Sequence, residues 1–585
     1  MTPNHESTTP TTARLVLFAA LGLLPLAAEV AAQSMTVGLS SVRARRFDNE
    51  AIPPYGPQAG DQFAWALATG DFDGDGADDL ATGIPFDDCL EESGPVDCGS
   101  VVVRYGIPGS GLGTGLAEQI LNQQESGHPE VAEHRDVFGW ALAACDLNGD
   151  GFDDLAVGVP LEDLALGLNL TIVDSGVVAI YYGSGAGLAI PATTVLKSNS
   201  IQAAQQQLGF ALACGDFDVD GADDLVVGVP GAVVSDQPGA GKIRVYPGSP
   251  TGVGAGAFTI HQDTLLIEGV AEAGDRFGEA LAVGDFDRLK TFYPDLAIGA
   301  PGENEGAGAV HWIRGSFVGL NVEFNFVFDL LAFGATPEAD DRFGHALAAG
   351  DFDGDFFDDL AIGAPGKDKG ALSNTGFVFV AYGQSTWALN FLHTQSFDQD
   401  GLFGAGHSES DDEFGSALAS GDFDRDGRAD LAIGHPFEAI TGGPSDGAVS
   451  VSVGAPAGLT GSRRRLFASG VEGIPGSAIE HQKLFGAALA AGDFDGDGHG
   501  DLAIGMPLAN SPGAADVGAE IVLYGSLFAD SFEGGSPSFW SDIAPQRAGV
   551  VFRSPIPLAR TGGARRPPRD GGRLAALREL EVPCA

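Results

Sequence analysis

The 585-residue chain has little positive charge, because 30 Lys and Arg residues stand against 80 Asp and Glu residues and give a formal net charge of −50. A body of this sign repels polyanions, which excludes nucleic acid and anionic membrane surfaces as favourable partners. Such acidity is typical of disordered or solvating chains. However, 44% of the residues are apolar, which is ample for a folded core.

Cysteine is also scarce, and five residues are too few to build a disulfide scaffold. Cys89 and Cys98 flank a short acidic segment, and we expect them to form a disulfide. Cys145 and Cys214 precede two similar acidic segments, where we expect buried free thiols rather than a second bridge. The sequence assigns no role to Cys584.

No apolar run is long enough to span a bilayer comfortably. The run nearest the N-terminus, from Leu15 to Ala27, follows Arg14 and leads into small residues that end at Ala32. This layout predicts a secretory signal peptide over residues 1–32. We therefore expect an exported protein, secreted or retained at the cell surface, with no transmembrane segment. No cysteine follows the predicted cleavage site directly, so a lipid anchor is not indicated.

Helical periodicity over ten or more residues is absent from the body of the chain, which instead repeats one segment seven times. The acidic cores of the copies begin 75, 70, 69, 66, 71 and 71 residues apart, at Asp71, Asp146, Asp216, Asp285, Asp351, Asp422 and Asp493. A repeat of this length cannot bury its own apolar face, so the copies must pack on one another.

Each period has room for four short strands: one before the acidic segment, one after it, one ending in Tyr-Gly or its equivalent, and a last apolar run. Four antiparallel strands per unit predict an all-β, seven-bladed β-propeller over residues 33–526. A β-solenoid of short calcium-binding repeats is excluded by the much longer period. Residues 45–47 resemble 464–467, and we expect the mature N-terminal strand to complete blade seven and close the ring.

The acidic segments share one ligand scheme, with polar side chains at offsets 0, 2, 4 and 8 and a backbone carbonyl at offset 6. In chain order, the candidate ligands are Asp71, Asp73, Asp75, Ala77, Asp79; Asp146, Asn148, Asp150, Phe152, Asp154; Asp216, Asp218, Asp220, Ala222, Asp224; Asp351, Asp353, Asp355, Phe357, Asp359; Asp422, Asp424, Asp426, Arg428, Asp430; and Asp493, Asp495, Asp497, His499, Asp501.

Alternate carboxylates in a tight turn repel one another unless a cation neutralises them, and this density of hard oxygen donors favours Ca²⁺ over Mg²⁺. A glycine at offset 5 in most copies supplies the positive φ needed to wrap the chain around the ion. An EF-hand is excluded because no Glu stands at the twelfth position and a strand follows the loop. A solvated acidic hairpin without metal is the alternative reading.

The fourth copy breaks the scheme. It has no carboxylate at offset 4 and two extra residues before Asp295, and Arg288 or Lys290 offers a cation to neutralise Asp285 and Asp287. We therefore expect about six calcium ions, with the fourth loop empty. The fifth copy keeps its ligands but has a phenylalanine where the others have glycine, so we expect a weaker site there.

These repeats resemble the FG-GAP repeat of the integrin α-subunit propeller and its bacterial relatives over residues 60 to 526. The resemblance is carried by Phe-Gly pairs at 138–139, 277–278, 343–344, 414–415 and 485–486, and by Gly-x-Pro endings at Pro85, Pro160, Pro230, Pro301, Pro365, Pro436 and Pro507. It implies a non-catalytic adhesion or protein-binding module.

Three function classes follow: an adhesion or protein-binding module, a carbohydrate-binding propeller, and an enzyme such as a polysaccharide lyase. The enzyme is the weakest reading, because the histidines are scattered and no nucleophile, zinc or phosphate-binding motif appears. Trp65 and Trp140 occupy matching places and leave sugar stacking open beside simple core filling. We expect a monomer that binds an extracellular protein or glycan, which the sequence does not name.

The acidic loops and the loops after Gly-x-Pro are expected on opposite rims of the ring. Variable loops on a rigid scaffold are where recognition resides in many folds, although loops also vary wherever insertions are tolerated. The longest candidates are 86–98 and 161–175. Beyond the ring, 527–545 forms a short segment with a Phe-Glu…Trp pattern. Residues 546–585 are rich in Arg and Pro, and we expect disorder there.

Overall fold

The computed structural model describes residues 39–525, except 49–57, 89–96, 114–115, 166–170, 199–203, 255, 288–292, 386–388, 440–445, 472–473, 476–482 and 512–513. The predicted signal peptide (1–32), the segment 527–545 and the tail 546–585 lie outside the described residues. The same holds for Cys89, Cys584, Arg288 and Lys290. No helix within the described ranges is long and apolar enough to cross a bilayer.

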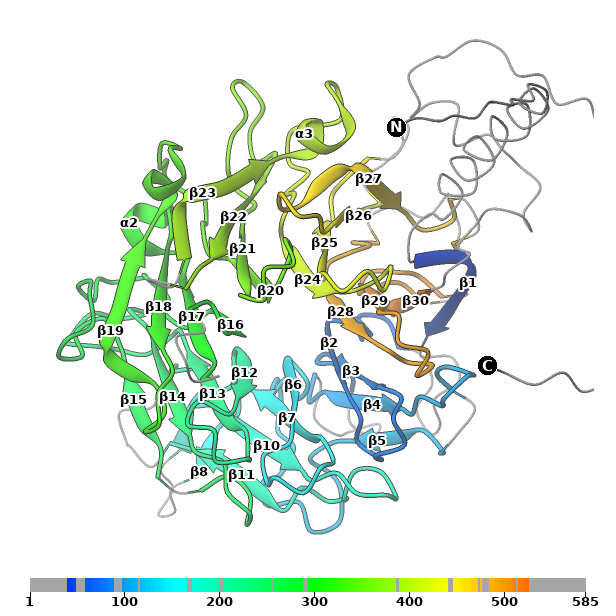
Figure 1. Ribbon diagram of the computed structural model, residues 1–585. Helices are drawn as coiled ribbons and strands as arrows, with labels where there is room; N and C mark the ends of the chain where they lie inside the picture. The colour runs from blue at the N-terminus through cyan, green and yellow to red at the C-terminus, as the bar shows by residue number, and fades with distance from the viewer. Residues whose placement is uncertain are drawn as a thin grey trace, which may run out of the picture. The chain divides into compact units, whose positions relative to one another are not determined.

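Seven four-stranded antiparallel sheets form a ring of blades, as the sequence predicts (Figure 1). In blades one to six the strands follow chain order from the ring centre outward, and the first strands of neighbouring blades contact one another around the centre. Every ladder between neighbouring strands is antiparallel, and blades one to six are built from strands that follow one another along the chain.

Blades one to three contain β2 (Ala66–Gly70), β3 (Asp79–Ile84), β4 (Ser100–Arg104) and β5 (Gln119–Leu121); β6 (Ala141–Cys145), β7 (Asp154–Val159), β10 (Val177–Tyr181) and β11 (Thr194–Lys197); and β12 (Leu212–Gly215), β13 (Asp224–Val229), β14 (Lys242–Tyr246) and β15 (Phe258–Ile260). A small hairpin, β8 (Leu164–Ala165) and β9 (Thr171–Ile172), lies in the loop of blade two.

Blades four to six contain β16 (Ala280–Gly284), β17 (Asp295–Ala300), β18 (Ala309–Arg314) and β19 (Asn321–Phe328); β20 (Ala346–Gly350), β21 (Asp359–Ala364), β22 (Phe377–Gly383) and β23 (Leu389–Phe397); and β24 (Ala417–Gly421), β25 (Asp430–His435), β26 (Ala448–Val453) and β27 (Thr460–Phe467). The short helices are α2 (Glu303–Gly306), η2 (Leu330–Phe333) and α3 (Gln399–Phe403).

Blade seven is assembled from both ends of the described chain, in the order β28 (Leu489–Gly492), β29 (Asp501–Met506), β30 (Ala519–Gly525) and β1 (Leu39–Asp48). Strand β1 pairs antiparallel with β30, with Phe47 opposite Glu520. The predicted ring closure by the N-terminal strand is therefore confirmed. It covers the edge of β30, which would otherwise offer unpaired backbone groups to another chain.

The Phe-Gly motif holds successive blades together. Phe138 of blade two is fully buried, and its N–H donates to the Cys98 carbonyl of blade one at 2.9 Å. A Cβ on Gly99 would lie 2.3 Å from the Phe138 carbonyl oxygen, and Gly99 also has φ +84°. Glycine is therefore required before the third strand for steric and conformational reasons. Equivalent bridges join Phe63, Phe277, Phe343 and Phe485 to a glycine of the preceding blade.

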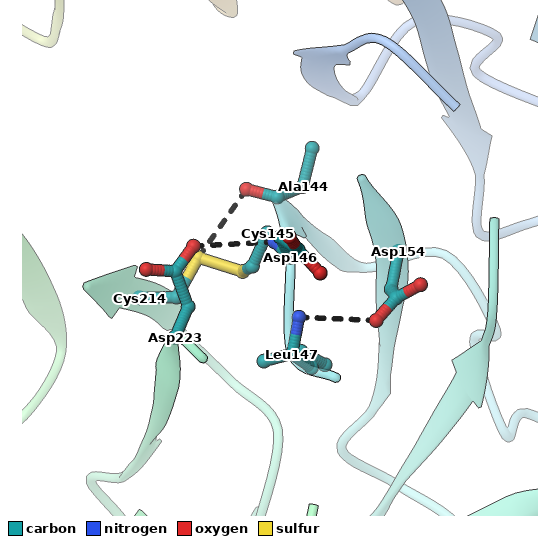
Figure 2. The surroundings of a disulfide bond; sticks show 7 residues. All are labelled: Ala144, Cys145, Asp146, Leu147, Asp154, Cys214 and Asp223. Carbon is teal, nitrogen blue, oxygen red and sulfur yellow. Dashed lines mark hydrogen bonds between the residues drawn. A yellow bond between two sulfur atoms is a disulfide. The ribbon is translucent and has the colours of Figure 1, made fainter. Parts of the chain in front are cut away.

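The expectation of free thiols at Cys145 and Cys214 is wrong, because the two form a disulfide with a Cα–Cα distance of 6.2 Å (Figure 2). Each lies near the end of an innermost strand, β6 in blade two and β12 in blade three. Innermost strands approach each other closely at the ring centre: a Cβ on Gly70 would lie 2.7 Å from the Ala144 Cβ of the next blade. Cysteines at matching heights on these strands are therefore within bonding distance.

The ring has two distinct rims. The first hairpin of each blade carries the acidic loop at one rim, as between Gly70 and Asp79, which pair across β2 and β3. The loops after Gly-x-Pro lie at the other end of the same strands, and this is the rim where α2 and η2 lie. The acidic loops and the variable loops therefore occupy opposite rims; below we call these the acidic rim and the loop rim.

Candidate metal centre

The six complete acidic loops share one backbone wrap around the first carboxylate. In loop one, Asp71 Oδ1 accepts from the Asp75 N–H at 3.0 Å and Asp71 Oδ2 accepts from the Gly76 N–H at 2.9 Å. The same two hydrogen bonds recur in loops two, three, five, six and seven. Gly76 has φ +90°, as the ligand scheme requires.

The side chains of the wrapped loops converge. One ligand oxygen from each of three aspartates lies within 4.8 Å of the others in five loops. The groups are Asp71, Asp73, Asp79; Asp216, Asp218, Asp220; Asp351, Asp353, Asp355; Asp422, Asp424, Asp430; and Asp493, Asp495, Asp497. Loop two supplies the amide oxygen of Asn148 at the second position, where it accepts from the Asp150 N–H at 2.9 Å. This donor set of carboxylate and amide oxygens fits Ca²⁺.

The last aspartate of each loop has a second role that the sequence does not show. Asp79 Oδ2 accepts from the Phe72 N–H and Asp79 Oδ1 from the Gly106 N–H, both at 2.8 Å, which ties the loop to the end of the third strand. The equivalent bond to the third strand occurs in all seven blades.

Electrostatics favour a cation at these loops. Burial raises the pKa of Asp79 to about 8, and the nearby carboxylates of Asp73 and Asp71 add to the rise. Burial likewise raises the pKa of Asp359 to about 8 and that of Asp501 to about 9. Carboxylates in this position resist ionisation until a cation compensates their charge. The backbone carbonyl expected at offset 6 remains a prediction, although the N–H of that residue donates to the offset-4 aspartate in all six loops.

Neighbouring acidic loops are joined by a second aspartate, just before the last ligand. The Asp71 N–H donates to Asp153 Oδ2 of the next blade at 2.9 Å, and the Asp493 N–H donates to Asp78 Oδ2 at 2.7 Å, which links blades seven and one. Asp223 and Asp358 make the same contact. Sequence reasoning missed these residues, although the Asp-Asp doublet in four of the seven copies is the signal that marks them.

The fourth loop is neutralised by a residue that the sequence did not single out. Arg314 Nε lies 2.8 Å from Asp287 Oδ2. Arg314 comes from the end of β18, where blades one, two, five and seven have a tyrosine before the closing glycine. Among the described residues, loop four contains no group of three convergent ligands. The expectation that this loop lacks calcium stays a prediction, as does the role of Arg288 and Lys290, which lie outside the described residues.

The tyrosines that Arg314 replaces connect the blades. The hydroxyl of Tyr105 accepts from the Leu188 N–H of the next blade at 2.9 Å, and Tyr382 makes the same contact with Leu459 at 3.0 Å. Tyr524 reaches Leu112 at 3.0 Å across the closure of the ring. Arginine at this position therefore replaces an interblade contact with a charge directed at the acidic loop.

Loop five differs at one residue. Phe356 takes the place of glycine, with φ +74° and 73% of its surface exposed. A left-handed conformation costs a bulky L-residue about 1–2 kcal/mol. The convergent carboxylates Asp351, Asp353 and Asp355 nevertheless keep the geometry of the other loops. Phe356 therefore strains loop five without displacing its ligands.

On the loop rim, aromatic side chains gather around the ring centre. The rings of Trp65 and Trp140 are 4.9 Å apart, and Phe86 and Phe210 extend the group at 5.6 Å from Trp65 and 5.5 Å from Trp140. Both tryptophans are half-buried. The group, called the aromatic cluster below, comes from blades one to three. The matching places in the next two blades hold charged or titratable side chains, Glu279 and His345.

Only part of the predicted loop 86–98 is described. Asp87 is 7% exposed and its Oδ2 accepts from the Ser100 hydroxyl at 2.6 Å, so this carboxylate serves the loop rather than a partner. Cys98 is disulfide-bonded. Cys89 lies outside the described residues, and the Cys89–Cys98 bridge stays a prediction.

Comparisons with known proteins match this architecture. The FG-GAP repeat family matches residues 63–103, 138–181, 343–380, 414–452 and 485–519. The chain is 30% identical over 249 residues to integrin alpha pat-2 of Caenorhabditis briggsae, covering 41% of this chain and 18% of that protein. It is 34% identical over 183 residues to phosphatidylinositol-glycan-specific phospholipase D of Rattus norvegicus, covering 31% of this chain and 20% of the relative.

The fold and these matches describe a seven-bladed β-propeller that carries FG-GAP repeats and is similar over part of its length to integrin α chains. The matches span about a fifth of each of these two relatives. An exotype rhamnogalacturonan lyase, YesX, aligns with a TM-score of 0.31 and 11% identity over 78% of this chain and 73% of that structure. A likeness at that level carries no argument about activity.

Proposed function

We propose that this protein is an exported, calcium-binding and non-catalytic propeller that binds an extracellular protein. The likeness to integrin α chains supports a binding module, and the signal-peptide layout of residues 1–32 supports export. N-terminal sequencing of protein recovered outside the cell tests export: a mature chain should begin near residue 33.

Calcium is the proposed cofactor, and the residues of six acidic loops fit it. The carboxylates and the Asn148 amide would hold the ions, with loop four excluded by the Arg314–Asp287 pair. Calcium would neutralise buried carboxylates that also tie the loops to the third strands. The ions therefore support a rigid ring, on which the opposite rim can present a fixed surface.

The aromatic cluster is the observation that carries the proposed binding role. Half-buried Trp65 and Trp140 lie on the rim that also carries the variable loops, and Phe86 belongs to one of those loops. Aromatic side chains are enriched in protein interfaces because they offer large contact areas at low entropic cost. Since the chain is strongly acidic, a partner with basic and apolar side chains on its surface suits this rim best.

The buried histidine of blade six does not support catalysis. Ser450 Oγ lies 2.9 Å from His435 Nε2, and Glu438 Oε2 lies 3.6 Å from His435 Nδ1. A serine, a histidine and a carboxylate are therefore neighbours, as in the triad of a serine hydrolase. However, Ser450 and His435 are both 0% exposed, and His435 Nδ1 also contacts the Gln399 amide at 3.3 Å. The group therefore forms a closed structural network that a substrate does not reach.

The experiment is an array of extracellular proteins and glycans probed with the mature chain in calcium. Trp65→Ala combined with Trp140→Ala should weaken any protein ligand found by tenfold or more, as for the central residues of other interfaces (about 2 kcal/mol each). Phe317→Ala is the matched control, because Phe317 is 75% exposed on the acidic rim. If the control abolishes binding and the tryptophan pair does not, the wrong rim has been assigned.

A further inference from the structure

A cavity of about 230 Å³ lies on the loop rim of blade four, away from both the acidic loops and the aromatic cluster. Its polar lining comes from Gln262, Glu303, Asn304 and Asp329, and its apolar lining includes Phe328. Asn304 is exposed and Glu303 is half-buried, so the cavity reaches solvent. Pockets for drug-sized ligands measure about 300–1,000 Å³, which makes this one suitable for a smaller molecule.

Buried polar groups with unused hydrogen-bonding capacity border the cavity. Gln262 is 2% exposed and its Nε2 donates to Glu303 Oε2 at 2.6 Å, while its Oε1 has no hydrogen-bond partner among the described residues. His311 is 1% exposed, and neither of its ring nitrogens has a partner in the described part of the chain. Buried polar groups are normally satisfied, so each of these calls for a ligand or an ordered water.

His311 lies directly behind the cavity wall. Gly269 lines the cavity, and a Cβ at this glycine would lie 3.2 Å from His311 Cε1, so the imidazole ring lies next to this lining residue. Burial lowers the pKa of His311 to about 3, and the imidazole is therefore neutral. A neutral imidazole provides one donor and one acceptor.

Blade six contains the same Gln–Glu pair beside a histidine whose two ring nitrogens both have partners. There Gln399 Nε2 donates to Glu438 Oε2 at 2.5 Å, as Gln262 does to Glu303, but the nearby imidazole of His435 contacts both Gln399 and Ser450. Blade two has the same Gln–Glu pair, Gln123 with Glu162. The unpartnered histidine is thus particular to blade four among these three blades.

We propose that the cavity of blade four binds one neutral sugar residue of a glycan. Acceptors from Glu303, Asp329 and Gln262 suit several hydroxyl donors, the Asn304 amide adds a donor, and Phe328 with Val327 offers an apolar surface to the C–H face of a pyranose ring. No Lys or Arg is among the lining residues, so an anionic sugar would bring its charge next to carboxylates without compensation. This site is separate from the aromatic cluster, and either proposal can fail without the other.

The test uses the full mature chain in calcium with free glucose, galactose, mannose, rhamnose and N-acetylglucosamine as probes. Saturation-transfer NMR should detect at least one of them, and galacturonate should give no signal. Glu303→Gln keeps the side-chain volume but removes a charged acceptor, and should weaken binding about tenfold in titration calorimetry. Glu162→Gln changes the same Gln–Glu pair in blade two and should leave the affinity unchanged.

Ala309→Leu is a second variant, because Ala309 lines the cavity and a larger side chain fills it. It should abolish the signal, and Glu303→Gln decides the case if the leucine variant does not fold. The proposal is overturned if no neutral sugar binds, in which case water fills the cavity. It is equally overturned if both variants bind like the wild type, or if putrescine binds at Glu303 and the sugars do not.

Discussion

Breaking the ion pair at the ring closure should destabilise the whole propeller. Arg104 of blade one, 1% exposed, contacts the fully buried carboxylate of Glu520 on β30, and the Thr82 hydroxyl donates to Glu520 Oε2 at 2.7 Å. The Arg104 guanidinium also lies 4.8 Å from the centroid of the Phe47 ring on the closing strand β1. One buried pair therefore links strands β3 and β4 of blade one with strands β30 and β1 of blade seven.

Glu520→Gln leaves the Arg104 charge buried with only Glu118 to compensate it, at 2.8 Å and at the partly exposed edge. Removing one partner of a buried pair costs about 3–5 kcal/mol of unfolding free energy. Replacing both Arg104 and Glu520 with methionine should recover most of that loss, because well-packed apolar groups substitute for buried pairs at little cost.

The assay is urea unfolding in saturating calcium, followed by tryptophan fluorescence and circular dichroism. Asp48→Asn is the control, because Asp48 pairs at 3.8 Å with Arg46 in a partly exposed position and should contribute less than about 1 kcal/mol. If Glu520→Gln unfolds at the same urea concentration as the wild type, or if the double methionine variant is less stable than the single one, the reasoning is refuted.

Three further predictions concern single features. Phe356→Gly should raise the free energy of unfolding by about 1 kcal/mol, because it removes a left-handed phenylalanine; an unchanged or lower urea midpoint contradicts this. Replacing Cys145 and Cys214 with serine opens a 69-residue loop and should lower the free energy of unfolding by about 4 kcal/mol relative to the oxidised wild type, and the reduced wild type should lose as much. In EDTA the melting temperature should fall as the pH rises from about 6 to 9. In the folded protein, the pKa values of Asp79 and Asp501 are about 8 and 9. These carboxyl groups therefore keep protons that the unfolded chain releases above about pH 4, and the folded state loses this advantage as they ionise. Saturating calcium should flatten this slope, and a flat profile in EDTA would count against buried, uncompensated carboxylates.

The repeat made the fold predictable from the sequence. Seven copies at one period fixed the number of blades, and the short apolar runs in each copy marked four strands, which the structure confirms. The closing strand was also predictable, because residues 45–47 resemble the outer strand of another blade and β1 pairs with β30 accordingly. A feature that recurs in every copy can be predicted from the sequence, because the copies can be aligned and compared with one another.

Contacts between blades were harder to predict, because they depend on which residues of adjacent copies lie at the same height. The Cys145–Cys214 bridge joins the ends of two inner strands. That the two cysteines lie at the same height on these strands is not visible in the sequence. Arg314 is 27 residues beyond Asp287, in a strand rather than in the loop it neutralises. In contrast, the sequence carries a signal for the contacts that join neighbouring acidic loops, because each accepting aspartate is the first residue of an Asp-Asp doublet. These residues are Asp78, Asp153, Asp223 and Asp358.

The central claim is that the acidic rim holds calcium in six of the seven loops, while Arg314 replaces the ion in loop four. Native mass spectrometry of the mature chain at saturating calcium, with a matched sample in EDTA, counts the bound ions directly. The account predicts six ions that EDTA removes. A seventh ion would contradict the role of Arg314, and a chain that binds no calcium would contradict the claim as a whole.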